Sequence, residues 1–229
     1  MFWRYTAGMT GKRTYADVCG VARALDTVGE RWALMIVREL LLGPKRFTDL
    51  RAGLPTLSPD VLTQRLRDLA EAGVIIRRKL PPPAPAQVYA LTALGAKLEP
   101  VVLALGNWGA LLPIPEGELR MSFDAHILSL RTLFDAERAD GFDAHVELRL
   151  GEESFAAIVS DGRFEIARGE LADPDAVIAT DASTLIAIAH GRRELDEALA
   201  AGEVSIDGAH DVVARFLGLF PLPTPALPA

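Results

Sequence analysis

The sequence predicts a multidomain protein: a mainly α half that contains one short hairpin, followed by an α+β half with an antiparallel sheet covered by helices. Apolar residues recur with helical spacing in the first 112 residues, whereas several β-like runs follow them. Up to Leu112 the chain holds 15 Lys and Arg against 9 Asp and Glu, and the remainder holds 9 against 22. Because the halves carry net charges of +6 and −13, we expect them to have different partners.

Composition limits the class of protein. Half of the 229 residues are apolar, which is enough to bury the cores of two domains of ordinary size. The single cysteine, Cys19, excludes an intrachain disulfide, and the N-terminal segment lacks the continuous apolar core of a secretory signal. No apolar run approaches the roughly 18 residues that a membrane-spanning helix needs. We therefore expect a cytoplasmic protein without membrane insertion.

The segment LLPIPEGEL marks the expected boundary between the halves. Pro113 and Pro115 cannot donate backbone hydrogen bonds and Gly117 loosens the chain, as an interdomain linker requires. The final FPLPTPALPA is rich in proline and uncharged, so we expect it to be disordered or to lie extended against a surface. The expected order is a tail over residues 1–14, a domain over 15–112, a linker over 113–119, a domain over 120–221 and a tail over 222–229.

Helical periodicity and capping residues predict the elements of the first domain. The apolar face of a first helix is formed by Val18, Val21, Ala22, Leu25 and Val28. Further helices are expected over residues 31–43, 47–52, 58–73 and 92–108, and short strands over 74–80 and 88–92, joined by PPPAPAQ. This order of helices, hairpin and closing helix is typical of a winged helix-turn-helix domain.

The helix expected over residues 58–73 has two different faces. Leu62, Leu66 and Leu69 share the apolar one. The opposite face carries Thr, Gln and Arg, which can hydrogen-bond base edges when a helix N-terminus enters the major groove. The residues expected to read double-stranded DNA are Ser58, Pro59, Asp60, Thr63, Gln64 and Arg67.

Cations near this helix are expected to contact the DNA backbone. Three of them alternate along the first strand of the hairpin, so at least two can reach phosphates. The full set of expected backbone and wing contacts is Lys45, Arg46, Arg65, Arg77, Arg78 and Lys79. The alternative is that these are ordinary solvated charges. The order of the elements, on the cationic half of the protein, favours DNA binding.

Residues 15–112 also resemble the HxlR-type transcriptional regulators. The most specific parts are the cysteine followed by VARALDTVGERW, and the segments ELLLGPKRFTDLR, SPDVLTQRLRDLAEAGVI and YALTALG. The resemblance implies a homodimer, formed largely by the first and last helices of the domain, that places two copies of the fourth helix in successive major grooves of an inverted-repeat operator. It also implies that residues 77–79 form the wing, and that Trp32 and Trp108 serve core or dimer packing.

Cys19 matches a cysteine near the start of many such regulators, some of which resemble thiol-based sensors of oxidants or electrophiles. A reactive thiolate needs nearby positive charge or a helix N-terminus. Cys19 lies in the first turn of its expected helix, although Asp17 opposes ionisation. The alternative is a small apolar residue at the edge of the domain.

The runs HVELRL, SFAAIVS, RFEIAR and DAVIATD predict the sheet of the second domain, after a helix over residues 121–138. ASTLIAIAHG, ELDEALAAG and AHDVVARFLGLF predict helices that cover one face of it. Residues 122–220 resemble sterol-carrier-type domains, chiefly over 201–208 and the preceding DASTLIAIAHG. This resemblance implies an apolar cavity lined by AAIVS, DAVIATD and VVARFLGLF, suited to an apolar small-molecule effector. The alternative is a closed core.

No catalytic motif is apparent in the sequence. His126, His145, His190 and His210 lack the spacing of a metal or catalytic site. We therefore expect no cofactor, no metal and no enzymatic activity. The expected function is a dimeric, sequence-specific transcriptional regulator. The alternative is a lipid or apolar-metabolite carrier or scaffold whose first half no longer reads an operator.

Overall fold

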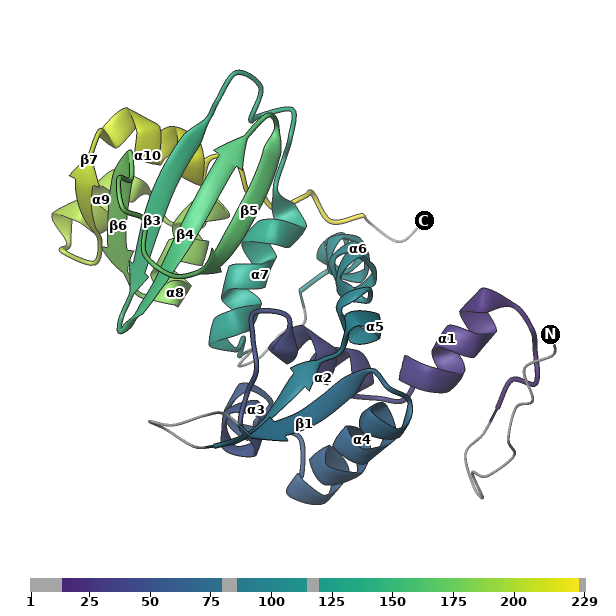
Figure 1. Cartoon of the computed structure of the whole chain (residues 1–229). Coiled ribbons are helices and arrows are strands. Elements are labelled where there is room, and N and C mark those ends of the chain that lie inside the picture. The colour runs from purple at the N-terminus through teal and green to yellow at the C-terminus, as the bar shows by residue number, and fades with distance from the viewer. Residues whose placement is uncertain (1–13, 80–85, 115–119, 227–229) are drawn as a thin grey trace.

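A computed structural model describes residues 14–79, 86–114 and 120–226. Within this part of the chain, one hydrophobic core lies between Val28 and Ile75 and another between Ile127 and Phe220. Figure 1 shows the two bodies, with helices α6 (Glu99–Ala110) and α7 (Phe123–Leu133) where they meet. The predicted fold class is confirmed. Most of the expected linker and N-terminal tail, most of the hairpin loop and the last three residues lie outside the described residues.

The first half contains the helices and the hairpin that the sequence predicts. Its remaining elements are α1 (Gly20–Val28), α2 (Ala33–Leu40), α3 (Phe47–Gly53), α4 (Pro59–Glu71), β1 (Ile75–Lys79), β2 (Gln87–Leu91) and α5 (Ala93–Ala96). Ser58 caps α4, because its side chain accepts a hydrogen bond from the Val61 N–H at 3.4 Å. The chain leaves α4 through Gly73, whose φ of +72° is a left-handed conformation that glycine adopts readily.

The hairpin is attached to the turn that precedes α3. β1 and β2 pair antiparallel. The Lys45 N–H donates to the Tyr89 carbonyl at 3.0 Å, and the Tyr89 N–H donates to the Lys45 carbonyl at 2.8 Å. The backbone at Lys45 therefore extends the hairpin by one short bridge and fixes it beside α3.

The last predicted helix of this domain, over residues 92–108, is in fact two helices. Thr92 caps α5 by accepting a hydrogen bond from the Gly95 N–H at 3.0 Å, as expected. The helix then breaks, and α6 starts at Glu99 with Pro100 in its first turn. Proline has no N–H to donate to the carbonyl four residues earlier, so a continuous helix through this position would lose a hydrogen bond.

The apolar face predicted for the first helix is largely exposed. Ala22 and Val28 are buried, but Val18 and Val21 are 92% and 67% exposed. Helix α6 has no buried residue at all, although its composition is strongly apolar. In the single chain, α1 and α6 therefore leave apolar surface uncovered.

The second half is a five-stranded sheet with helices packed against it. Its remaining elements are β3 (Ala144–Leu150), β4 (Glu153–Ser160), β5 (Arg163–Arg168), β6 (Ala176–Thr180), α8 (Ala182–Ala189), α9 (Leu195–Ala200), β7 (Ser205–Gly208) and α10 (His210–Leu217). The strand order is β5-β4-β3-β6-β7. Alternate residues of β4 are buried beneath the helices, as the pleat of a strand requires. Leu148, Phe155 and Phe216 are among the largest fully buried side chains.

The expectation of a wholly antiparallel sheet is wrong at one pair, because β3 and β6 run parallel. Two hairpin turns connect β3 to β4 and β4 to β5. After β5, the chain crosses the sheet and adds β6 on the side of β3 that is opposite to β4. The crossing segment is held by Glu147, which accepts from the Leu171 N–H at 2.9 Å, and by Asp175, which accepts from the His145 N–H at 2.7 Å. A crossover of this kind produces a parallel neighbour.

Candidate nucleic-acid interface

Helix α4 presents the polar face that the sequence predicts. Leu62, Leu66 and Leu69 are at most 2% exposed and fix the orientation of the helix on the core of the first half. The predicted reading residues are all exposed: Ser58, Pro59, Asp60, Thr63, Gln64 and Arg67. One continuous polar surface therefore runs along α4 from its N-terminus.

Two of these side chains are held by the helix itself. Thr63 Oγ1 donates to the Pro59 carbonyl at 2.8 Å, and Gln64 Nε2 donates to Asp68 Oδ1 at 3.0 Å. Both hydrogen bonds are exposed, so the two side chains could replace them with other hydrogen bonds at little cost in free energy. The Arg67 guanidinium is exposed beside them.

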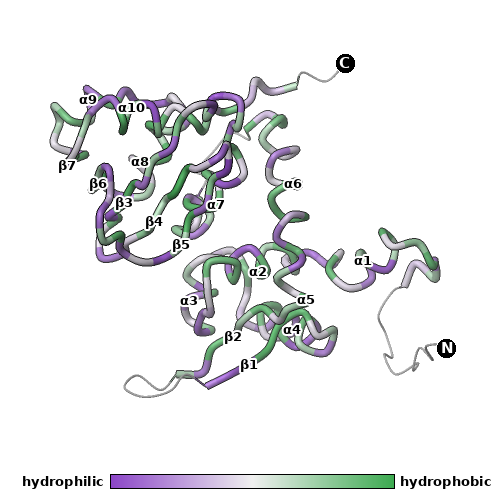
Figure 2. The backbone as a smooth tube through the Cα atoms, turned by 45° about the horizontal axis from the view of Figure 1, so that its top comes forward, coloured by the Kyte–Doolittle hydropathy of each residue, from purple (hydrophilic) through white to green (hydrophobic). Residues whose placement is uncertain are grey.

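The wing carries its cations on strand β1. Arg77, Arg78 and Lys79 are exposed and pair across the hairpin with Tyr89, Val88 and Gln87, respectively. Because side chains alternate along a strand, Arg77 and Lys79 share one face. Figure 2 shows the hydrophilic end of β1.

Two other predicted DNA contacts lie differently from the expectation. Lys45 is only 15% exposed, with its ammonium 2.7 Å from Glu39 and 2.9 Å from Asp124. Arg65 is 19% exposed and pairs with Asp68 at 2.9 Å and with Glu30 at 3.5 Å. The side chain of Lys45 thus points into the protein, and we leave it out of the proposed DNA-contacting set. Arg46 is exposed, as predicted.

Cys19 is the N-cap residue of α1 and is exposed, one position before the helical turn in which the sequence placed it. Its N–H donates to Asp17 Oδ1 at 2.8 Å. The backbone N–H groups of Val21 and Ala22, at the start of α1, lower the pKa of the thiol below its usual value. The helix N-terminus therefore stabilises a thiolate at this position.

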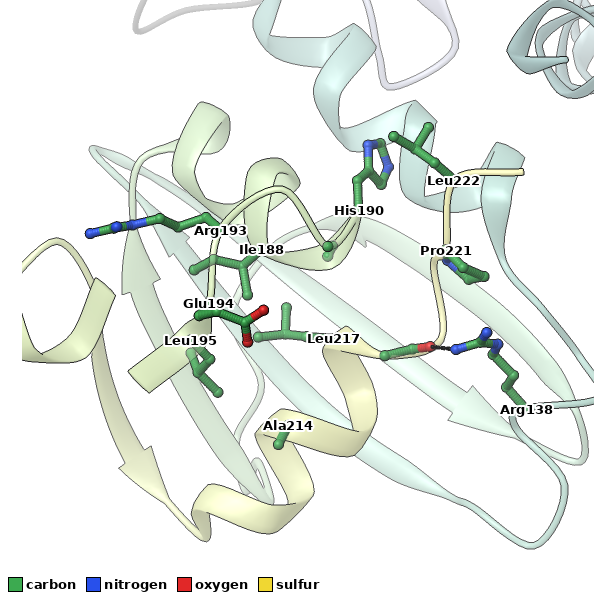
Figure 3. Close-up of a pocket in the computed structure, with 13 residues that line it drawn as sticks. Arg138, Ile188, His190, Arg193, Glu194, Leu195, Ala214, Leu217, Pro221 and Leu222 are labelled. Carbon is green, nitrogen blue, oxygen red and sulfur yellow. Dashed lines mark hydrogen bonds between the residues drawn. The ribbon is translucent and has the colours of Figure 1, made fainter. Parts of the chain in front are cut away.

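A pocket of about 380 Å³ lies in the second half. It opens between the end of α8, the turn before α9, helix α10 and the C-terminal segment (Figure 3). Ile188, Leu195, Leu217, Pro221 and Leu222 supply apolar walls, and Arg138, His190, Arg193 and Glu194 add polar groups.

This pocket is not the cavity predicted from the sequence. The residues AAIVS and DAVIATD contribute nothing to its lining; Ala157, Val159 and Ile178 are buried in the core of the second half. Only the run VVARFLGLF contributes, through α10. Beyond the pocket, the C-terminal segment reaches the first half, where the Ala226 N–H donates to the Leu111 carbonyl at 2.8 Å.

Comparison with known proteins assigns the first half. Residues 27–113 match the family model described as HxlR-like helix-turn-helix. The HTH-type transcriptional regulator YdeP of Bacillus subtilis (strain 168) is 37% identical over 91 residues, which are 40% of this chain and 71% of YdeP. The regulator YvaP of the same organism is 38% identical over 87 residues, 38% of this chain and 80% of YvaP.

The chain belongs to the HxlR-like helix-turn-helix family. It is thus a DNA-binding transcriptional regulator with a winged helix-turn-helix domain. No helix in the described part of this HxlR-like chain is long and apolar enough to cross a membrane.

The second half matches a different family model. Residues 119–228 match the model described as Alkyl sulfatase C-terminal. A solved structure of the sec-alkylsulfatase Pisa1 from Pseudomonas sp. is 23% identical and covers 47% of this chain and 17% of that enzyme, with a TM-score of 0.41. The sterol-carrier-type resemblance stays a prediction.

The sequence reasoning missed Glu39, Ser122 and Asp124, which join the two halves. Ser122 Oγ donates to Glu39 Oε1 at 2.6 Å, and Glu39 is 0% exposed. One signal was available. Glu39 follows Ile36 by three positions and so falls on the apolar face of its helix, where a charge needs a partner.

Proposed function

We propose that the protein is a homodimeric, sequence-specific regulator that reads an inverted-repeat DNA site through α4 and grips flanking phosphates with its wing. The observation that carries this proposal is the exposed polar face of α4, anchored by buried leucines and lying beside the cationic strand β1. The reading set is Ser58, Pro59, Asp60, Thr63, Gln64 and Arg67, and the backbone set is Arg46, Arg65, Arg77, Arg78 and Lys79. Domain limits at 15–112 and 120–221 belong to the same proposal, and the two family models support them.

Dimerisation through α1 and α6 follows from their uncovered apolar residues. On α6, Val101, Leu105 and Trp108 are 49%, 50% and 60% exposed. Exposed apolar residues concentrated on two helices are typical of an association surface. A twofold axis through this surface would place two copies of α4 in successive major grooves, about one helical turn apart.

The test of DNA reading is Arg67→Ala. We expect it to weaken binding to the preferred site by about 1–3 kcal/mol, the range for a good side-chain contact to a base. Binding to unrelated DNA should change much less. Lys97→Ala is the matched control. Lys97 is an exposed cation of the same domain, but it lies at the C-terminal end of α5 and on neither α4 nor β1. Equal affinities for the two variants, measured by fluorescence anisotropy with competitor DNA present, would contradict the assignment.

We infer that the pocket beside α10 is the effector site. Its walls suit an apolar body. At one end lies the exposed Arg138 guanidinium, which pairs with Asp135 at 3.3 Å and donates to the Gly218 carbonyl at 3.2 Å, and which would also attract an anionic group. A medium-chain fatty acid has this chemistry. Decanoate should raise the unfolding temperature, whereas decanol, which lacks the charge, should raise it less. Ala214→Trp would fill the pocket from α10 and abolish the difference; the same shift in that variant would place decanoate elsewhere.

For Cys19 we propose thiol-based sensing of electrophiles. The helix N-terminus supports it by favouring the thiolate. The expected result is faster alkylation by iodoacetamide at pH 7 than for a free model thiol, together with altered DNA affinity after modification. Cys19→Ser should abolish both effects. An alkylation rate no higher than that of the model thiol would refute sensing.

The pocket also favours a second candidate function, that of a lipid or apolar-metabolite carrier or scaffold that no longer reads an operator. In that case Arg67→Ala would change no measurable property while ligand binding persisted.

A further inference from the structure

A buried cluster of charges joins the start of α7 to α2 and to the turn before α3. Lys45 Nζ lies 2.7 Å from Glu39 Oε2 and 2.9 Å from Asp124 Oδ2. Glu39 is 0% exposed and Asp124 is 2% exposed. One ammonium from the first half thus bridges a carboxylate from each half, in a place with little water.

Each carboxylate of this cluster also has a partner on its outer side. Arg168 Nη2 donates to Asp124 Oδ1 at 2.6 Å, and Arg38 Nη2 donates to Glu39 Oε1 at 2.7 Å. Arg168 also lies over the Phe155 ring at 5.0 Å, which fixes the guanidinium on the second half. Asp124 Oδ2 accepts no hydrogen bond among the described residues, so the ion pair with Lys45 is its compensation for burial. The loss of one partner of a buried charge is costly.

The cluster favours the ionised form of Glu39. Burial pushes the pKa of Glu39 upward, but hydrogen bonds from Lys45 and Ser122, with the nearby charge of Arg38, outweigh it, so the pKa lies below its usual value. The ion pair therefore stays intact at neutral pH. The packing is also tight, because a β-carbon at position 53 would collide with the Glu39 carboxylate.

Lys45 connects this cluster to the wing. Its side chain binds Asp124 of the second half, while its backbone is bonded in both directions to Tyr89 of β2. The next residue, Arg46, directly precedes α3. A movement of α7 relative to the first half would therefore displace the turn at Lys45, which is bonded to the hairpin and leads into α3.

We propose that Asp124 and Lys45 are positioning residues for DNA recognition. Through them, the second half holds the wing and the turn before α3 in the conformation that binds DNA. This inference rests on the proposed function. It gives the second half a part in DNA reading through positioning, even when no effector is bound.

A second contact between the halves involves the same helix. Arg131 of α7 pairs with Glu99 of α6, and a β-carbon at Gly106 would lie 3.0 Å from Thr132 Cγ2. Helix α7 therefore contacts both Lys45, whose backbone holds the hairpin, and α6, which carries the proposed dimer surface.

The test is Asp124→Asn in the full chain, which removes the charge but keeps the size of the side chain. We expect affinity for the preferred DNA site to fall by about 2- to 30-fold, as for other residues that act through positioning. The dependence of affinity on salt should keep its slope, because no cation that meets phosphate is lost. Asp196→Asn is the control: it makes the same change on an exposed residue of the second half that pairs with His210. Affinity equal to that of this control would overturn the proposal.

A direct phosphate contact by Lys45 predicts different results. Asp124→Asn would then free the ammonium and maintain or raise affinity, and Lys45→Met would reduce the salt slope by about 0.9. Either result would also overturn the proposal. Gly53→Ala, whose added methyl group would collide with the Glu39 carboxylate, is the second variant should Asp124→Asn prevent folding. It should likewise lower affinity with an unchanged slope.

Calorimetry separates this inference from the proposed function. The wild-type protein should unfold in one coupled transition, and Asp124→Asn should divide it into two. If the wild type binds no DNA, the proposed function fails, while the calorimetric comparison still decides whether the cluster couples the halves. An unchanged single transition in Asp124→Asn would show that it does not.

Discussion

The dimer surface proposed on α1 and α6 allows the size of an effect to be predicted. Trp108 is 60% exposed on α6, near Leu105 and Val101 on the same helix. A tryptophan buries roughly 150–250 Å², so about 90–150 Å² remain to be covered. At ~25 cal/mol per Å², covering that area contributes about 2–4 kcal/mol per copy. Both copies contribute at a twofold interface, and the cost of association reduces the net value.

Trp108→Ala should therefore raise the dimer dissociation constant at least about tenfold, because more than 1.4 kcal/mol is lost. Sedimentation velocity over a range of concentrations measures the change. Ile76→Ala is the control, because Ile76 is 52% exposed but lies on the wing. A Trp108→Ala protein that dimerises as tightly as the wild type, or a wild type that stays monomeric at micromolar concentration, would refute the reasoning.

Three further predictions concern stability. Burial, followed by the charges of Arg192 and His126, lowers the pKa of His190 to about 4, so the unfolded state alone takes up a proton between pH 6.5 and 4. The wild type should lose up to ~3 kcal/mol of stability as pH falls through that window; denaturant unfolding of His190→Asn should show a weaker loss, and the same loss would contradict the assignment. Asp181 caps α8, and despite burial, bonds from the side chains and N–H groups after it lower its pKa to about 2. Asp181→Ala should cost about 0.5–2 kcal/mol at pH 7, and the wild-type contribution should fade as pH drops from about 4 toward 2; an unchanged midpoint in urea would argue against the cap. Ser58→Ala should lower the free energy of unfolding by about 1 kcal/mol, because it removes the cap of α4. Thermal unfolding should show a lower midpoint, and an unchanged midpoint would contradict the role of the cap.

Local signals made α4 predictable. Ser58 and Pro59 mark its start, Gly73 marks its end, and leucines at helical spacing define its buried face. Pro100 could also have indicated the break between α5 and α6, since a proline inside a helical pattern removes a hydrogen bond. These features depend on residues close in sequence.

The ion pairs and the pocket depend on how distant elements pack. Lys45 looked like a phosphate contact because it is a cation near α3, but Glu39 on α2 and Asp124 on α7 both pair with its ammonium and hold it inward. The effector cavity was expected inside the sheet, whereas the pocket lies beside α10. In the core, the aromatic residues Phe164, Phe216 and Phe220 pack against one another. Apolar composition alone does not distinguish a filled core from a cavity.

The most direct test of DNA reading is selection from a random pool of double-stranded DNA by the purified full-length protein, followed by sequencing of the retained fragments. An inverted repeat with half-sites about one helical turn apart, bound more weakly by Arg67→Ala, is the predicted result. Retained fragments that share no sequence, or binding that Arg67→Ala leaves unchanged, would contradict a regulator that reads DNA through α4.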